Sequence, residues 1–229
     1  MEPLVLHHLE QSRARRIVWL LEELKVPYSI KTYKRDPKTM LGPKELRQVH
    51  PLGKSPLISD PNNGHRVLAE SGAIVEYIVA RYGNGRFIPP DNTDARLRWT
   101  YWLHYAEGSL MPLLLLRLVF DKVAHSPVPF FIKPIVQGID KTVSGVFISP
   151  ELKLHLGFIE AELAANPHGW FAGDTISAAD VQMSYPLEAA MQRAHNDASK
   201  TAIVTFLDRI HDRPAYQKAC EVTGETWKT

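Results

Sequence analysis

The sequence is poor in cysteine, because Cys220 is the only one among its 229 residues. A single cysteine excludes an intrachain disulfide and any CxxC redox or zinc motif. Basic residues are not concentrated either: 27 Lys and Arg stand beside 25 Asp and Glu, and no block of them reaches the density of a nucleic-acid surface. We therefore expect no nucleic-acid partner.

Long apolar runs are also missing. The strongest, residues 110–120, is too short to span a bilayer and is interrupted by Pro112 and Arg117. The N-terminal residues carry no basic region followed by an apolar one, so a secretory signal is not indicated. With 45% hydrophobic and 23% charged residues, the composition is that of a globular protein. We expect a cytoplasmic protein without a membrane partner.

The first eighty residues alternate between the two-residue period of strands and the three- to four-residue period of helices. One helix begins at Ser12 and is stopped by Val26-Pro27, and the Asn63-Gly64 pair predicts a β-hairpin. The order is β-α-β-α-β-β-α. The other predicted elements are strands at 4–6, 28–33, 56–59 and 66–68 and helices at 44–49 and 70–82.

Beyond a linker at 84–93, the pattern is helical and shows no convincing strand pair. We therefore divide the chain into an α/β domain at 1–83 and an all-helical domain at 94–229. The proline-rich stretch 124–145 fits no single period. Ser177 and Asp180 form a capping box, with Ile176 and Val181 as its hydrophobic staple. The predicted helices are 94–120, bent at Pro112, then 150–165, one that starts at Ser177, and 202–209.

The stretch around Ser55-Pro56 is the most informative motif. A proline that opens an apolar strand is unusual, because proline cannot donate to the ladder. A cis Ser55-Pro56 turn accounts for it and leaves the backbone of Ser55 able to pair with an extended peptide. Glu70-Ser71 then begins a helix, whose first amides favour a carboxylate. Together these features predict a site for a small acidic peptide.

Four motifs in this order resemble the cytosolic glutathione transferase superfamily, closest to fungal and bacterial enzymes of the first yeast class. They are SRARRIVWLLEEL at 12–24, HPLGKSP at 50–56, Glu70-Ser71, and FAGDTISAAD at 171–180. The resemblance covers essentially the whole chain. It implies a thioredoxin-like first domain, a helical second domain that contributes the electrophile pocket, glutathione as cosubstrate without a tightly bound cofactor, and a homodimer.

The resemblance also assigns glutathione-binding roles to five residues. Ser55, in the cis turn with Pro56, pairs its backbone with the cysteinyl residue, Glu70 and Ser71 hold the γ-glutamyl amine and carboxylate, and Lys54 meets the glycyl carboxylate. The charges of these residues match those of glutathione independently of the resemblance. The zwitterionic γ-glutamyl group needs an acceptor and a donor, and the glycyl carboxylate needs a cation.

A thiol with a pKa of about 8.5 needs a group that stabilises its thiolate at neutral pH. Ser12 fits this role, since it lies where the first strand turns into a helix, although an N-cap serine is an equally ordinary interpretation. Family members that use tyrosine place it where His7 and His8 stand here, and no cysteine lies near position 12, which disfavours mixed-disulfide chemistry. His104 and Tyr105, on the long helix, are the reserve activators.

Other side chains have competing interpretations. We expect Arg15 and Arg16 to be solvated and paired with Glu22 or Glu23, and Arg13 to lie near an anion. His7 and His8 do not predict a metal site, because neighbours on a strand face opposite sides and no acidic or cysteine partner has ligand spacing.

The electrophile should bind between the domains, against a wall formed by Tyr101, Tyr105, Gly108 and Pro112 at helical spacing. Two function classes remain open: a transferase for hydrophobic electrophiles, with peroxidase activity toward organic hydroperoxides as a second activity, and a non-catalytic ligand carrier or protein-interaction module on the same fold. The candidate contributors to a dimer interface are Tyr77, Arg81, Trp99 and Trp102.

Overall fold

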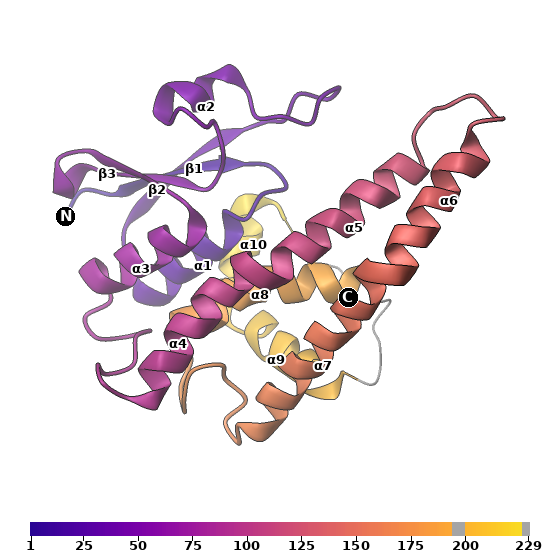
Figure 1. Cartoon of the computed structure of the whole chain (residues 1–229). Coiled ribbons are helices and arrows are strands. Elements are labelled where there is room, and N and C mark those ends of the chain that lie inside the picture. The colour runs from indigo at the N-terminus through magenta and orange to yellow at the C-terminus, as the bar shows by residue number, and fades with distance from the viewer. Residues whose placement is uncertain (194–199, 226–229) are drawn as a thin grey trace.

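A computed structural model describes residues 1–193 and 200–225. A four-stranded sheet with its helices comes first, and every element of the described chain beyond residue 69 is helical (Figure 1). The predicted fold class, a thioredoxin-like domain followed by an all-helical domain, is confirmed.

The sheet has the strand order β2-β1-β3-β4. β1 runs parallel to β2 and antiparallel to β3, which pairs antiparallel with β4. Helix α1 (Arg15–Leu24) supplies the crossover that a parallel pair requires. A short 3-10 helix (η1, Pro61–Asn63) and Gly64, at φ 62°, turn the β3–β4 hairpin where the Asn-Gly pair predicted it. The strands are β1 (Leu4–Leu9), β2 (Tyr28–Tyr33), β3 (Leu57–Asp60) and β4 (Arg66–Ala69).

Alternation along β1 places its side chains on two faces of the sheet. Leu4 and Leu6 join the main core with α1 and α3 (Ser71–Tyr82), whereas Leu9 packs in a smaller cluster with Leu46 of α2 (Lys44–Val49). Figure 1 shows α2 on one side of the sheet and α1 and α3 on the other, toward the helical body. β1 therefore packs against helices on both faces of the sheet.

Two long helical runs form an antiparallel pair, and each contains a π-helical turn. The first comprises α4 (Asp94–Tyr105), η2 (Ala106–Leu110) and α5 (Met111–Ala124), and the second α6 (Lys133–Val143), η3 (Ser144–Ile148) and α7 (Ser149–Ala165). A proline is the second residue after each π turn, Pro112 and Pro150. Since proline lacks an N–H, it interrupts the α-helical ladder at these points. Figure 1 shows α5 and α6 projecting beyond the rest of the fold.

Three further helices complete the body: α8 (Ala178–Arg193), α9 (Thr201–His211) and α10 (Pro214–Thr223). The predicted capping box at the start of α8 is confirmed, because Ser177 donates its amide and its hydroxyl to Asp180 Oδ2 at 2.7 and 2.8 Å. Burial raises the pKa of Asp180 to about 6, against the opposing effect of hydrogen bonds from Phe171 and Ser177.

Several predicted elements differ from the structure. Helix α1 begins at Arg15 rather than at Ser12, the second helical run covers 133–165 rather than 150–165 alone, and α10 was not predicted. The sequence left open whether Trp99 and Trp102 lie in the core or at a subunit interface, and at 3% and 1% exposed both lie inside the main core.

One helix of the described chain, Asp94–Ala124, has the length and mean hydropathy (1.2) of a candidate membrane span. However, 39% of its most apolar window is buried inside the protein, and core helices of folded proteins meet the same criterion.

Candidate glutathione and electrophile site

Ser12 lies in the loop between β1 and α1 and is 5% exposed. Its hydroxyl oxygen accepts the amide of Ala14 at 3.3 Å and lies 3.2 Å from the hydroxyl of Ser55. Ala14, in helical conformation, is the N-cap of α1 and has no side-chain cap, so Ser12 is not the N-cap. The backbone of the loop, and not a helix N-cap, therefore sets the position of the Ser12 hydroxyl.

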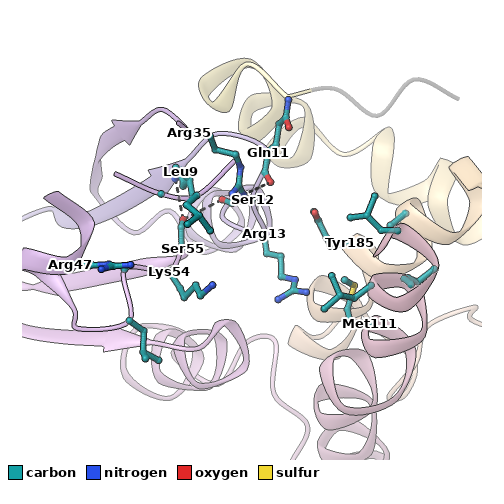
Figure 2. A pocket seen from close by; sticks show the side chains of 18 residues that line it. Leu9, Gln11, Ser12, Arg13, Arg35, Arg47, Lys54, Ser55, Met111 and Tyr185 are labelled. Carbon is teal, nitrogen blue, oxygen red and sulfur yellow. Dashed lines mark hydrogen bonds between the residues drawn. The ribbon is translucent and has the colours of Figure 1, made fainter. Parts of the chain in front are cut away.

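Ser55 lies next to Ser12, and the Ser55-Pro56 bond is cis, as predicted. The Ser55 hydroxyl donates to the carbonyl of His7 at 2.9 Å and accepts the amide of Leu9 at 3.1 Å. Because a serine hydroxyl has a single proton, Ser12 must be the donor in the Ser12–Ser55 pair. Figure 2 shows these two side chains together at the wall of a cavity. The Ser12 proton is thus the one that can turn toward a ligand.

The cavity has a volume of about 400 Å³ and lies between the α/β domain and helices α5 and α8. One wall is polar and carries Ser12, Ser55, Lys54 and Arg13, whereas the opposite wall is mainly apolar (Figure 2). Such a pairing suits a polar cosubstrate beside an apolar one. The residues contributed by α5 and α8 are Met111, Leu114, Leu115, Leu118, Tyr185 and Ala189.

A smaller hollow of about 260 Å³ shares Arg13, Leu52, Lys54 and Ser55 with this cavity. All five residues that the sequence assigned to glutathione line it: Lys54, Ser55, Pro56, Glu70 and Ser71. The side chains of Lys54 and Glu70 make no hydrogen bond or ion pair within the described residues. Glu70 is the N-cap of α3 at φ 68°, and its side chain makes no capping hydrogen bond to the helix. The structure therefore brings together the predicted anionic and cationic groups.

A buried polar network behind this hollow was not predicted. Arg16, 2% exposed, donates to Ser71 Oγ at 2.7 Å and to the backbone carbonyl of Gln182 at 2.7 Å, and it pairs with Glu107. Glu107 also pairs with Arg13 at 3.3 Å. Burial lowers the pKa of Arg16, and Glu107 opposes that effect. The network joins α1, α3, the π turn η2 and α8.

The prediction of solvated arginines on α1 is consequently wrong. Arg15 is 3% exposed and pairs with Glu188, which also accepts hydrogen bonds from His211 at 3.1 Å and from Tyr216. Glu23 pairs instead with Arg213, at 2.9 Å between Oε2 and Nη2. Sequence spacing pointed to partners within α1, whereas the real partners lie on elements that fold against it.

The residues predicted from the long helix do not line the cavity. Tyr101, Gly108 and Pro112 are exposed on another face of that helix, and the cavity wall begins at Met111. Tyr105 is buried and bonds to His155 Nδ1, and burial raises the pKa of its phenol. His104 is exposed and lines neither hollow. Neither reserve activator is therefore beside Ser55.

His7 and His8 point to opposite faces of β1. His7 bonds to the hydroxyls of Tyr33 and Ser59 at 2.9 and 3.0 Å, and burial, with Lys31 nearby, lowers its pKa. His8 bonds to Glu225 at 3.1 Å. Across residues 1–193 and 200–225, no group of three His, Cys, Asp or Glu side chains is placed to hold a metal ion.

Comparison with protein families matches residues 2–80 to the glutathione S-transferase N-terminal domain and residues 131–218 to a glutathione S-transferase C-terminal domain. The chain belongs to the glutathione S-transferase family. This transferase is 38% identical over 220 residues to glutathione S-transferase 3 of Schizosaccharomyces pombe, covering 95% of this chain and 87% of that protein. It is 36% identical over 190 residues to glutathione S-transferase 1 of Saccharomyces cerevisiae, covering 82% and 80%.

Solved structures agree with this assignment. A glutathione S-transferase from Actinobacillus pleuropneumoniae superimposes with a TM-score of 0.76 at 33% identity, over 98% of this transferase and 94% of that chain. A glutathione transferase homologue from Lodderomyces elongisporus, solved with two GSH per subunit, has the same fold, with a TM-score of 0.72 at 24% identity, over 97% and 99%.

Proposed function

We propose that this glutathione S-transferase activates the glutathione thiol for attack on hydrophobic electrophiles, with Ser12 as the hydrogen-bond donor to the sulfur. The observation that carries the proposal is the position of Ser12 on the polar wall of the cavity, where its only proton is donated to the neighbouring Ser55 and faces the apolar side chains of α5 and α8. A hydrogen bond to a charged group is stronger than one between two neutral hydroxyls. The Ser12 hydroxyl therefore gains by turning from Ser55 to a thiolate.

The tripeptide fits the smaller hollow in one direction. The Ser55 backbone pairs with the cysteinyl residue, Lys54 meets the glycyl carboxylate, and Glu70 accepts from the γ-glutamyl ammonium. Ser71, as the first residue of α3, offers its amide to the γ-glutamyl carboxylate, where the helix dipole favours an anion. Arg13, 35% exposed at its side chain, adds a cation at the same end.

In the reaction, the thiol loses its proton to solvent and the sulfur attacks the electrophilic carbon. A C–S bond forms, and the leaving group, such as chloride, departs with its bonding electrons. Ser12 acts by stabilising the thiolate, and the walls act by holding both partners in contact. The apolar side chains of α5 favour flat or aliphatic electrophiles without strong directional specificity.

We propose peroxidase activity toward organic hydroperoxides as a second reaction at the same thiolate. The sulfur attacks the terminal peroxide oxygen, the alcohol leaves, and a second glutathione converts the sulfenic acid to glutathione disulfide and water. No protein cysteine is needed. Cys220 contacts Arg15 at 3.9 Å and lines neither hollow.

The test is steady-state turnover of 1-chloro-2,4-dinitrobenzene and of cumene hydroperoxide by the wild type, by Ser12→Ala and by Ser29→Ala, an exposed serine of β2. We expect Ser12→Ala to lower kcat at neutral pH by roughly tenfold to a hundredfold, the loss expected for a hydrogen bond to a charged group, and Ser29→Ala to change nothing. A wild type without turnover would instead favour the carrier function. Full activity in Ser12→Ala would remove Ser12 as the activator.

We also propose a homodimer. Trp99 and Trp102 are occupied in the core, but other apolar side chains of the same helical run are exposed, with Leu97 at 72% and Tyr101 at 48%. An apolar stripe of this kind is typical of a surface that is covered in the assembled protein.

A further inference from the structure

The loop that carries Ser12 is held from both sides. Gln11, just before Ser12, has a φ of 53°, in the left-handed region that is unfavourable for a residue with a side chain. Arg35 bonds through Nη2 to the carbonyl of Gln11 at 3.0 Å and through Nε to the carbonyl of Glu10 at 2.9 Å. The surroundings therefore impose this backbone conformation on the loop.

The second support comes from the other end of the chain. The amide of Gln11 donates to Glu225 Oε1 at 2.7 Å. The same oxygen bonds at 3.1 Å to Nε2 of His8, which is 1% exposed in β1, so this His8 nitrogen carries a proton. The Glu225 carboxylate is 20% exposed. It is the only group among the described residues that bonds to the Gln11 amide.

The helix that precedes Glu225 packs against the helix that follows Ser12. Helix α10 lies against α1, where the rings of Tyr216 and Trp19 meet edge to face with centroids 5.4 Å apart. Gly224, at φ 66°, is the C-cap of α10, and its left-handed conformation ends the helix one residue before Glu225. A side chain placed there would be strained, so the glycine serves the turn that sends Glu225 to the loop.

We propose that Glu225 is a positioning residue for the transferase reaction: by fixing the amide of Gln11, it holds the next residue, Ser12, in place against the thiol of glutathione. This inference rests on the proposed role of Ser12. If the Gln11 amide is released, the loop can leave its left-handed conformation, and the Ser12 oxygen moves with it. Displacements of about 1 Å in a reacting geometry can cost up to a hundredfold in rate.

The experiment is a double-mutant cycle between Glu225→Ala and Ser12→Ala, measured as kcat/KM for 1-chloro-2,4-dinitrobenzene across pH. We expect Glu225→Ala to lower kcat/KM about tenfold at neutral pH and to raise the apparent pKa of the bound thiol. In the Ser12→Ala background, the same change should have an effect of less than about twofold. Glu225→Gln should retain most of the activity, because its amide oxygen can still accept from Gln11.

The matched control is Glu221→Ala, which removes a carboxylate of α10 that pairs on the surface with Lys218 at 2.9 Å. It should leave the pH profile and kcat/KM unchanged.

If Glu225→Ala lowers only thermal stability and does not shift the pH profile, the residue is merely structural and the proposal is wrong. Equal effects of Glu225→Ala with and without Ser12 would also overturn it. An inactive wild type would overturn the proposed function together with this inference, whereas an active wild type with an unaffected Glu225→Ala variant would overturn this inference alone.

Discussion

At the scale of single residues, the proposed activation of the thiol depends on where the Ser12 proton goes. Ser55 donates its proton to the carbonyl of His7 and accepts from Leu9, so its hydroxyl is fixed by the end of β1. Ser12 donates its proton to Ser55. Ser55 is therefore a fixed acceptor, and Ser12 is a donor whose hydroxyl can rotate. Under the proposal, the thiolate of glutathione competes with Ser55 for the Ser12 proton.

Asp180 supplies a prediction about pH. Its pKa is about 6 in the folded protein, whereas an accessible aspartate carboxyl has a pKa of 3.8. The folded state therefore binds the proton more tightly, so this group's contribution to stability is fully present below pH 3.8 and is lost as the pH rises through 6. Between pH 7 and pH 5 the wild type should gain about 1 kcal/mol of unfolding free energy from this group.

The measurement is urea unfolding of the wild type and of Asp180→Asn at both pH values. Asp180→Asn cannot titrate, so the stability difference between the two proteins should change by about that amount between the two pH values. A difference that is independent of pH would mean that the hydrogen bonds from Phe171 and Ser177 outweigh burial and keep the carboxylate ionised throughout.

At the scale of elements, the π turn η2 places an acid from the helical domain behind the smaller hollow, which is lined by Lys54, Ser55, Glu70 and Ser71. Glu107 lies in this turn and bonds to Arg13 and Arg16 of the other domain. π turns occur often at functional sites, and here the π turn carries the carboxylate of Glu107 that bonds to both arginines. Pro112, two residues after the turn, accounts for its location.

Glu107 supplies the second prediction. Glu107→Ala should lower the free energy of unfolding by about 2–3 kcal/mol, because it leaves the buried charge of Arg16 without its partner. Adding Arg16→Met should recover part of that loss, since the charge is then absent as well. The measurement is the urea midpoint of the two single variants and of the double variant.

Its control is Glu162→Ala, which breaks a surface pair with Arg98 at 2.9 Å. This change should cost less than about 1 kcal/mol. Additive losses from Glu107→Ala and Arg16→Met would contradict the coupling and would mean that Arg16 is stabilised by Ser71 and Gln182 alone.

The same elements show what the sequence can and cannot predict. The α/β order was predicted correctly because its strands and helices are short, periodic and punctuated by Pro27, Pro56 and Gly64. The five residues assigned to glutathione line one hollow, as two local motifs in the sequence predicted, and their roles in binding stay a prediction. The partners of Arg15 and Arg16 were missed, since Glu188 and Glu107 are far away in sequence and become neighbours only after the domains pack.

The residues predicted for the electrophile wall do not line the cavity beside Ser12, for a different reason. Helical spacing groups Tyr101, Tyr105, Gly108 and Pro112 into one set, but it does not say which way that set faces. In addition, the π turn before Met111 adds a residue to the helical turn and rotates the side chains after it, including Pro112, relative to Tyr101 and Tyr105 before it. From this run of helices, the cavity is lined by Met111, Leu114, Leu115 and Leu118.

At the scale of the whole molecule, one face of the long helix exposes apolar side chains. Tyr101 of α4 and Phe158 of α7 are 48% and 38% exposed, and their ring centroids lie 6.4 Å apart, so two helices share one aromatic patch. Leu97 and Leu154, at 72% and 66%, precede these two residues by one helical turn each. This surface is apolar over two neighbouring helices, and a second copy of the chain would remove it from water.

The last prediction tests that surface. We expect the wild type to sediment as a dimer, and the double variant Leu97→Glu/Leu154→Glu to raise the dimer Kd roughly a hundredfold, because burying unpaired carboxylates at an apolar contact costs several kcal/mol. The control is Val222→Glu, which introduces a carboxylate at a 38% exposed valine of α10, away from this surface, and should leave the dimer intact. Analytical ultracentrifugation over a concentration series measures all three proteins.

Dimers of undiminished stability in the double variant would place the interface on another face, and a monomeric wild type would contradict the dimer itself. Circular dichroism of the variants separates dissociation from unfolding, since a folded monomer retains its helical signal while its sedimentation coefficient falls.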